Sequence, residues 1–240
     1  MPRGRRDWGL VAATGLILFC LNYGLVYWGA QFISSGLTAV LQAATPAFGL
    51  VFAHYLLPGE RVTAAKVWAL GLGVVGVAVI FFNQLQLAGR EALLGSAAVT
   101  GGALFVALSY VLVKARGEGL RPTALMAGQM LCGAVPLLAF AYATEGSPLP
   151  LRWTPTAVAS LLYLALAGSV LAFWLNYWLL RRMDAMKVLM MNIVEPPLAV
   201  LLGALLLGEE MTWRTAFGGA CVLLSVWLVL RRKAVTSDKG

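Results

Sequence analysis

Charged residues are scarce in this sequence of 240 residues. Only 12% of the residues are Asp, Glu, Lys or Arg, whereas 60% are hydrophobic and the mean hydropathy is +0.83. A folded protein of this size cannot hide so much apolar surface from water, which excludes a soluble globular enzyme. The composition also excludes a disordered chain and a coiled coil. It leaves a polytopic membrane protein.

The sequence also has few residues of the kinds that enzymes and metal sites use. It contains one histidine, His54, and three cysteines far apart in apolar runs, Cys20, Cys132 and Cys221. No CxxC motif or Cys/His cluster is present, so neither a metal site nor a disulfide framework is supported. A Walker motif is absent as well, so we expect no nucleotide and no cofactor. An intramembrane enzyme is the weaker alternative, because it would need clustered acids, histidines or an activated nucleophile.

Long apolar runs account for most of the chain. A membrane-spanning helix needs about 20 residues, and these runs do not alternate apolar with polar residues as a membrane barrel would. We therefore predict an all-α membrane protein with eight transmembrane helices and short connectors. The predicted spans are 8–33, 37–57, 63–82, 92–113, 122–143, 155–180, 188–207 and 215–230.

The distribution of basic residues predicts the topology. If the N-terminus lies in the cytoplasm, eight passes place all but three of the 18 Lys and Arg residues on the cytoplasmic side. The exceptions are Arg90, Arg152 and Arg214. Such a bias is the positive-inside signal of a multi-pass protein. We expect a cell-membrane protein with both termini in the cytoplasm, and the net charge of +8 does not indicate nucleic-acid binding.

An internal repeat relates the beginning of the chain to its end. A shift of 150 residues brings similar residues into register in the same order, with a slip of one residue before the last pair. The matches are Tyr27-Trp28 with Tyr177-Trp178, Pro46 with Pro196, and Glu60-x-x-Thr63 with Glu209-x-x-Thr212. Five passes separate equivalent spans, so the second copy enters the membrane from the opposite face. Inverted repeats of this kind are typical of secondary transporters with alternating access.

The repeat also predicts how the chain is divided. Spans four and five precede the second copy and have no counterpart in the first. The predicted units are 1–82, an incomplete first repeat of three helices, 92–233, a second repeat of five helices, and a cytoplasmic tail, 234–240. Two interpretations stay open at this point, a natural eight-helix form and a truncated, inactive fragment.

Two stretches resemble a known family. One is SGLTAVLQAATP (35–46) followed by LPGERVT (57–63), and the other is NIVEPPLA (192–199) followed by LLLGEEMT (205–212). In this pattern the chain resembles the EamA type of the drug/metabolite transporter superfamily. The resemblance implies a ten-helix transporter fold of which the first two helices are lacking here. It also implies transport of a small organic metabolite or drug-like solute by a secondary transporter or permease.

Glu195 is the acidic residue that lies well inside a predicted span. It is about eight residues into the seventh run, which at 1.5 Å per residue is a depth of about 12 Å. Asn192 shares its helix face, and Pro196 and Pro197 predict a kink with unpaired carbonyl groups beside the carboxyl. Glu195 either binds a cationic group or carries a proton, or it hydrogen-bonds a neighbouring helix and holds the kink.

Other polar and aromatic residues are candidates for a central cavity. Gln42 and Thr45 occupy the equivalent positions before Pro46 in the first copy. The alternative for all of them is hydrogen bonding between helices or anchoring at the membrane interface. The further candidates are Asn22, Tyr23, Asn176, Tyr177, Trp174 and Gln129. The expected partners are the lipid bilayer, a small-molecule substrate, a coupling proton or ion, and a second copy in a homodimer.

Overall fold

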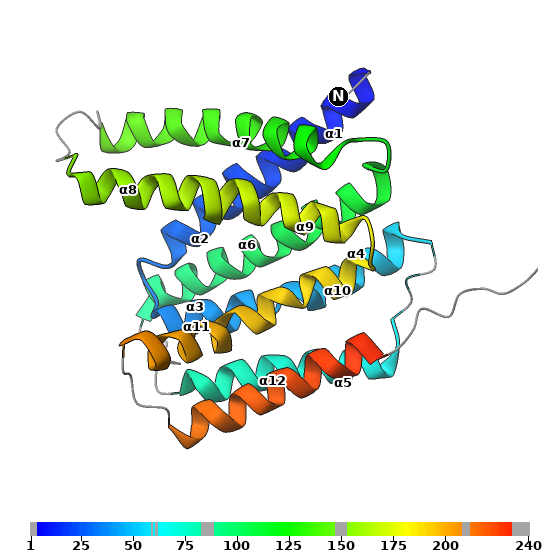
Figure 1. Ribbon diagram of the computed structural model, residues 1–240, viewed down its shortest axis with the longest axis vertical. Helices are drawn as coiled ribbons and strands as arrows, with labels where there is room; N and C mark the ends of the chain where they lie inside the picture. Colours follow the sequence, from blue (N-terminus) through cyan, green and yellow to red (C-terminus); the bar gives the residue numbers. More distant parts are fainter. Residues whose placement is uncertain are drawn as a thin grey trace, which may run out of the picture.

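The computed structural model describes residues 4–58, 60, 62–82, 89–146, 153–207 and 212–231, and the regular structure in them is helical (Figure 1). The predicted residue Glu209 and the predicted tail 234–240 lie outside the described residues.

Each of the eight predicted runs coincides with helix, and several runs consist of two or three consecutive segments. The first half contains α1 (Arg5–Gly15), the π-helical turn η1 (Leu16–Asn22), α2 (Tyr23–Gly29), α3 (Ser35–Gln42), α4 (Thr45–Leu56) and α5 (Ala64–Ile80). The second half contains α6 (Gly89–Arg116), α7 (Pro122–Glu145), α8 (Pro155–Tyr163), the π-helical turn η3 (Leu164–Leu171), α9 (Ala172–Leu180), α10 (Ala185–Leu189), α11 (Met191–Leu207) and α12 (Trp213–Arg231).

Six stretches of helix are long and apolar enough to cross a bilayer. They are Arg5–Gly29, Ser35–Leu56, Gly89–Arg116, Pro122–Thr144, Pro155–Leu180 and Ala185–Leu202. Two shorter apolar helices, Ala64–Ile80 and Trp213–Val229, accompany them. In the described part of the chain, the fold is therefore that of a helical membrane protein.

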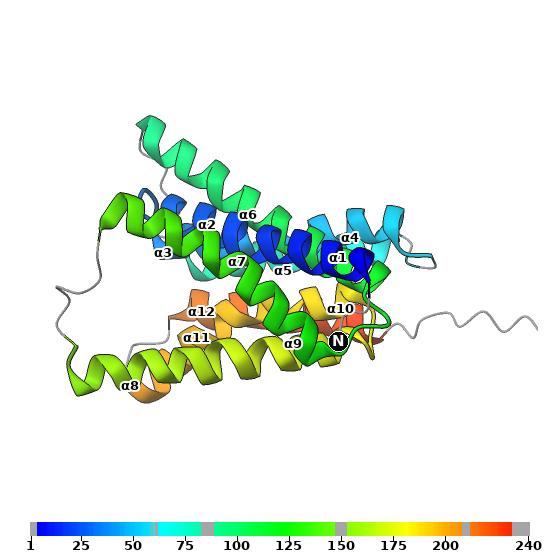
Figure 2. The ribbon, with the colours of Figure 1, turned by 90° about the horizontal axis from the view of Figure 1, so that it is seen from above.

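The helices lie in two layers. Seen from above, α1 to α6 form one layer, and α8 to α12 form the other (Figure 2). Helix α7 crosses between the layers, and α1 and η1 pack against it and against α6. The two layers thus follow one another along the sequence, and α7 connects them.

Helices α5 and α12 lie side by side at the edge of the bundle (Figure 1). A Cβ atom on Gly76 would lie 2.7 Å from the carbonyl oxygen of Gly218, and one on Gly218 would lie 2.5 Å from that of Gly76. Such close backbone approach needs glycine on both sides. The Ser225 hydroxyl adds a hydrogen bond to the Ala69 carbonyl at 2.6 Å. The pair joins the predicted span 63–82 to the predicted span 215–230.

The link between α9 and α10 is fixed by two ionisable side chains from other elements. The Lys114 ammonium at the end of α6 donates to the carbonyls of Leu180, at 2.6 Å, and Met183, at 3.0 Å. Glu60, in the connector after α4, accepts a hydrogen bond from the Ala185 N–H at 3.0 Å. Burial raises the pKa of the Glu60 carboxyl above its ordinary value, and this hydrogen bond only partly offsets the rise.

The kink predicted at Glu195 stays a prediction, and the helix is interrupted at a different residue. Helix α11 continues through Pro196 and Pro197, and the interruption lies at Met190, between α10 and α11. A proline inside a helix costs one hydrogen bond and crowds the carbonyl four residues earlier. An interruption upstream places both prolines near the start of α11, where the crowded carbonyls belong to the first residues of the helix.

Candidate functional site

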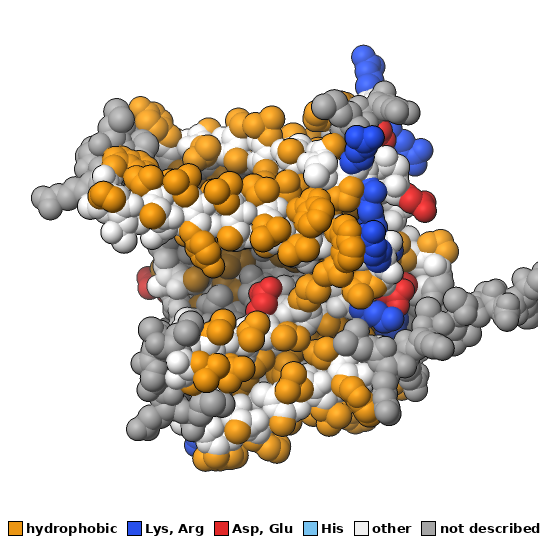
Figure 3. All heavy atoms as spheres, viewed as in Figure 1, with side chains coloured by type: hydrophobic (Ala, Val, Ile, Leu, Met, Phe, Trp, Pro, Cys, Tyr) orange, Lys and Arg blue, Asp and Glu red, His pale blue; other side chains and the backbone are white. Residues whose placement is uncertain are grey.

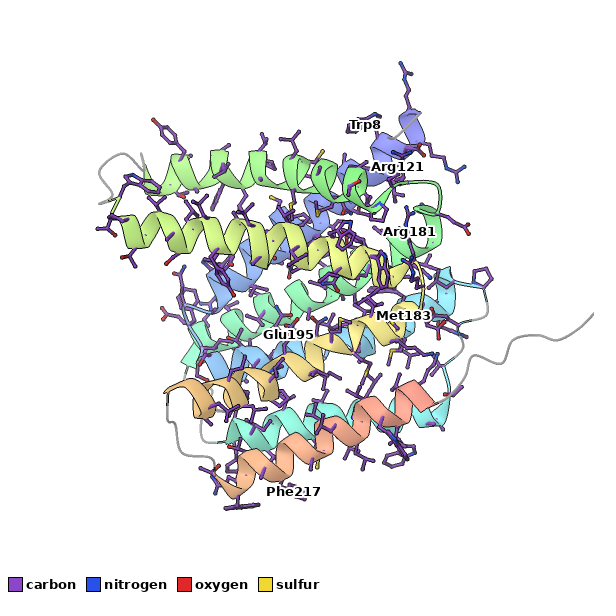
Figure 4. The ribbon with its side chains drawn as sticks, viewed as in Figure 1. Trp8, Arg121, Arg181, Met183, Glu195 and Phe217 are labelled. Atoms are coloured by element: carbon purple, nitrogen blue, oxygen red, sulfur yellow. The ribbon has the colours of Figure 1, made fainter. Side chains whose placement is uncertain are left out.

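A cavity of about 570 Å³ is lined by residues of both layers of helices. Figure 3 shows a hollow in this face of the molecule with an acidic side chain inside it, and Figure 4 identifies that side chain as Glu195. The first half of the chain contributes a set of polar side chains to the lining. They are Asn22, Ser35, Thr38, Gln42 and Thr45. The second half contributes Asn176, Asn192 and Glu195.

The polar lining of the first half comes mainly from one face of a broken helix. Ser35, Thr38, Gln42 and Thr45 are spaced three or four residues apart, which places them on one side of α3 and the start of α4. Pro46 has no N–H for the Gln42 carbonyl four residues earlier. The Thr45 hydroxyl replaces it and donates to that carbonyl at 2.6 Å. At the break beside the cavity, a hydrogen bond from a side chain therefore takes the place of the missing backbone hydrogen bond.

The second broken helix, α10–α11, faces the cavity with a carboxylate. Asn192 and Glu195 lie on one face of the first turns of α11, and Pro196 lines the cavity beside them. At Met190 the chain makes a turn, in which the Ile193 N–H donates to the Met190 carbonyl at 3.1 Å. Glu195 is exposed rather than buried against a neighbouring helix. Its carboxyl group is therefore available inside the cavity.

Two asparagines line the cavity from the helices with π-helical turns. The Asn22 amide nitrogen donates to the Leu18 carbonyl at 3.3 Å, and the Asn176 amide nitrogen donates to the Ala172 carbonyl at 3.1 Å. In both cases the donor bonds to the residue's own helix. Asn176 is half-buried and lines the cavity, and its amide group keeps one N–H and its oxygen for other partners.

Aromatic rings form the apolar part of the lining. Tyr23, Tyr110 and Phe173 line the cavity, and Phe81 joins them from the end of α5. Behind them Phe19 packs on Phe173, with 4.8 Å between ring centroids, and on Tyr23, with 5.9 Å. Offset and tilted ring pairs at such distances are attractive. The rings are thus held by packing before any solute enters.

Three of the predicted site residues lie elsewhere. Tyr177 is buried behind Tyr110, with 5.9 Å between the ring centroids, and does not line the cavity. Trp174 is partly exposed and also lies outside the lining. Gln129 is fully buried between helices and donates to the Thr14 hydroxyl at 2.6 Å. For Gln129 the structure therefore favours the alternative of hydrogen bonding between helices.

The remaining predicted residues lie around one space, and further residues that the sequence analysis did not single out complete the lining. The seven predicted residues that line the cavity are Asn22, Tyr23, Gln42, Thr45, Asn176, Asn192 and Glu195. Additional polar and aromatic residues of the lining include Ser35, Thr38, Phe81 and Tyr110. The regular spacing of Ser35 and Thr38 with Gln42 was a usable signal. Tyr110 carried no signal, because nothing in an apolar run tells which aromatic faces inward.

The chemistry of the cavity is that of a binding site with one negative charge. Among the described residues that line it, Glu195 is the one charged side chain. The described part of the chain contains no group of three or more His, Cys, Asp or Glu residues that could hold a metal ion. The arrangement can bind a small solute or a proton.

Comparison with known proteins gives one family and several relatives. The EamA-like transporter family matches residues 1–82 and 93–231. The uncharacterized transporter YoaV of Bacillus subtilis is 30% identical over 213 residues, which are 88% of this chain and 72% of that protein. A probable terminal-alkyne amino-acid exporter of Streptantibioticus cattleyicolor is 27% identical over 239 residues, 96% of this chain and 75% of that protein.

A solved crystal structure shares the fold. It superposes with a TM-score of 0.80, covers 95% of this chain and 76% of that chain, and is 14% identical in sequence. At this identity the likeness concerns the fold alone.

Proposed function

Because this chain belongs to the EamA-like transporter family and is a membrane transporter of small solutes, we propose that a small organic metabolite crosses the membrane through the cavity by alternating access. One observation carries the proposal. The cavity is lined from both halves of the chain, by the broken helices α3–α4 and α10–α11. Broken helices that face each other are where transporters place their ligands.

We propose that the two halves are related by the inverted repeat. Several structural features recur at the spacing that the sequence predicts, and they support this proposal. Helix α3 begins at Ser35 and α10 at Ala185, 150 residues later. Thr63 and Thr212 each accept a hydrogen bond from the N–H three residues on. The π-helical turns η1 and η3 interrupt the corresponding long helices.

The same symmetry supports the proposal of three helices in the first repeat and five in the second. The helix from α1 to α2 is covered by α6 and α7. Its proposed counterpart, the helix from α8 to α9, has no buried residue in α8 or η3. We propose that in the membrane this face is covered by a pair of helices equivalent to α6 and α7. A homodimer joined through the same face stays a prediction.

The orientation in the membrane is also a proposal. In Figure 3, Lys and Arg side chains gather at one end of the helices, the end where α1 begins. This gathering supports an N-terminus in the cytoplasm of a cell membrane, because cytoplasmic ends carry the basic excess. Residues 234–240 are expected on the same side.

We propose that Glu195 is the ionisable group of the transport cycle, either by binding a cationic group of the solute or by carrying a proton. Its exposure inside the cavity supports this role. One relative is named as an amino-acid exporter, and an amino acid carries an ammonium group, which is in keeping with the first of the two roles.

The test compares a variant that blocks the cavity with a matched variant that changes only the outer surface. Ala39 lines the cavity from α3, and Ala220 is exposed on α12. In proteoliposomes loaded with a labelled panel of amines, amino acids, carboxylates and sugars, Ala39→Trp should abolish exchange of the solute that the wild type exchanges. The matched variant Ala220→Trp should retain it. Equal exchange by both variants would show that the route lies elsewhere.

A further inference from the structure

We propose that the solute taken by this cavity is an organic ammonium compound, a compact molecule with one positively charged amino group and an apolar body. The inference rests on the proposed function and names the substrate class of the same site. It is carried by one juxtaposition, the Glu195 carboxylate in a cavity that also contains the rings of Tyr23 and Phe173.

The carboxylate of Glu195 favours a solute with a positive charge. A carboxylate inside a membrane bundle is costly unless it is paired. Within the described part of the chain no ion pair forms with Glu195, and no Lys, Arg or His belongs to the lining of the cavity. The protein therefore does not neutralise this charge from within the site. A cation from outside satisfies it, whereas an anionic solute meets repulsion.

Two hydroxyl groups of the lining offer acceptors to a solute. The Thr45 hydroxyl donates to the Gln42 carbonyl at 2.6 Å, and the Thr38 hydroxyl donates to the Ser34 carbonyl at 3.0 Å. Each hydroxyl has one donor and uses it within its own helix, so its remaining capacity is to accept. Together with the Glu195 carboxylate they form a set that suits a ligand rich in N–H groups. An ammonium group has three donors and no acceptor.

The volume and the apolar lining of the cavity favour a compact solute with an apolar body. Ligand pockets usually have volumes of about 300–1,000 Å³, and the 570 Å³ of this cavity falls in that range. Apolar and aromatic side chains, among them Leu18, Val106 and Phe173, make up much of the lining. They remove an apolar body from water, and aromatic faces attract an ammonium group as well. A compact apolar amine therefore fits both parts of the cavity.

The experiment measures binding to the full chain purified in detergent. The probe is radiolabelled 2-phenylethylamine, and the competitors are unlabelled 2-phenylethylamine, the neutral 2-phenylethanol and the anionic phenylacetate. We expect saturable binding that the amine displaces at least tenfold more strongly than either competitor does. Equal displacement by the alcohol and the amine would overturn the inference.

The matched variants are Glu195→Gln and Glu91→Gln, since Glu91 is an exposed glutamate in the first turn of α6. Glu195→Gln should weaken binding of the amine at least tenfold and abolish the preference over 2-phenylethanol, while Glu91→Gln binds as the wild type does. Glu195→Asp keeps the charge and should keep the preference. Melting temperatures establish that each variant is folded. Unchanged amine binding by folded Glu195→Gln would overturn the inference.

The outcome separates this inference from the proposed function. If the amine binds through Glu195 but no solute crosses proteoliposomes, the substrate class stands and alternating access fails. If solutes cross while Glu195→Gln binds the amine unchanged and loses only the pH dependence of transport, Glu195 carries a proton, and the proposed function stands without the ammonium substrate.

Discussion

The two broken helices that face the cavity, α3–α4 and α10–α11, differ in where they are interrupted and in their chemistry. In the first, the Thr45 hydroxyl donates to the carbonyl that Pro46 leaves without a backbone donor. In the second, the position beside Pro196 holds a carboxylate that is exposed in the cavity. The first broken helix satisfies its free carbonyl with its own side chain, whereas the second carries the acidic group of the cavity. The acidic chemistry of the site therefore comes from α11 alone among the described lining residues.

The largest effect is expected from removing that charge. Glu195→Gln should lower the transport rate of the accepted solute about 100-fold, or about 2.7 kcal/mol, because the variant loses the carboxylate that binds the cationic group or carries the proton. Initial rates of uptake into proteoliposomes give the measurement. The folded Glu91→Gln variant should transport at the wild-type rate. A Glu195→Gln rate within twofold of the wild type would remove the distinction between the two broken helices.

Glycine substitutions in α5 and α12, the helices that follow the two breaks, should lower the melting temperature by similar amounts. Gly76→Ala in α5 and Gly218→Ala in α12 each force a Cβ atom against the carbonyl of the other glycine, and overpacking of this kind costs about 1–3 kcal/mol. We expect similar losses of melting temperature in detergent for both. Gly71→Ala is the control, because nothing lies within 4 Å of a Cβ atom there. Very unequal losses would speak against reciprocal packing.

The stability of the α3–α4 break should depend on the Thr45 hydroxyl. Thr45→Val keeps the shape of the side chain and leaves the partly buried Gln42 carbonyl without this donor, which costs about 1 kcal/mol. The expected result is a lower melting temperature. Thr45→Ser restores the donor and should melt near the wild type. If Thr45→Val melts like the wild type, the hydroxyl does not close the break.

The smallest effect concerns Glu60, which holds the link before α10. Glu60→Ala removes the acceptor for the Ala185 N–H and should cost about 1–2 kcal/mol, whereas Glu60→Gln keeps an acceptor. Burial raises the pKa of the Glu60 carboxyl in the folded protein, so the ionised form is disfavoured on folding. Wild-type stability relative to Glu60→Gln should therefore fall as the pH rises from about 4 towards neutral. Melting curves at several pH values measure this, and an opposite slope would contradict it.

Much of the helical pattern follows from the sequence, because long apolar runs, helix caps and connectors are local features. The predicted run 155–180 coincides with the helix from Pro155 to Leu180. The residues around the two breaks were also accessible, since Gln42 and Asn192 stand out as polar positions beside a proline. Both line the cavity.

What the sequence could not give depends on packing between distant helices. Tyr177 and Gln129 have the same character as residues in the lining, yet they are buried between helices. Which face of a helix meets the cavity is decided by its neighbours, such as Tyr110 against Tyr177. The interruption at Met190 was not accessible either, because a proline removes a hydrogen bond but does not fix where a helix is interrupted.

The most direct test of the central claim, that the cavity between the two broken helices opens alternately to both sides, is the accessibility of one residue in its lining. Asn192→Cys, with Cys20, Cys132 and Cys221 replaced by alanine, would be exposed to a membrane-impermeant thiol reagent from each side of oriented vesicles. Alternating access predicts labelling from both sides, and a solute that occupies the cavity slows both reactions. Labelling from one side alone under all conditions would contradict the account.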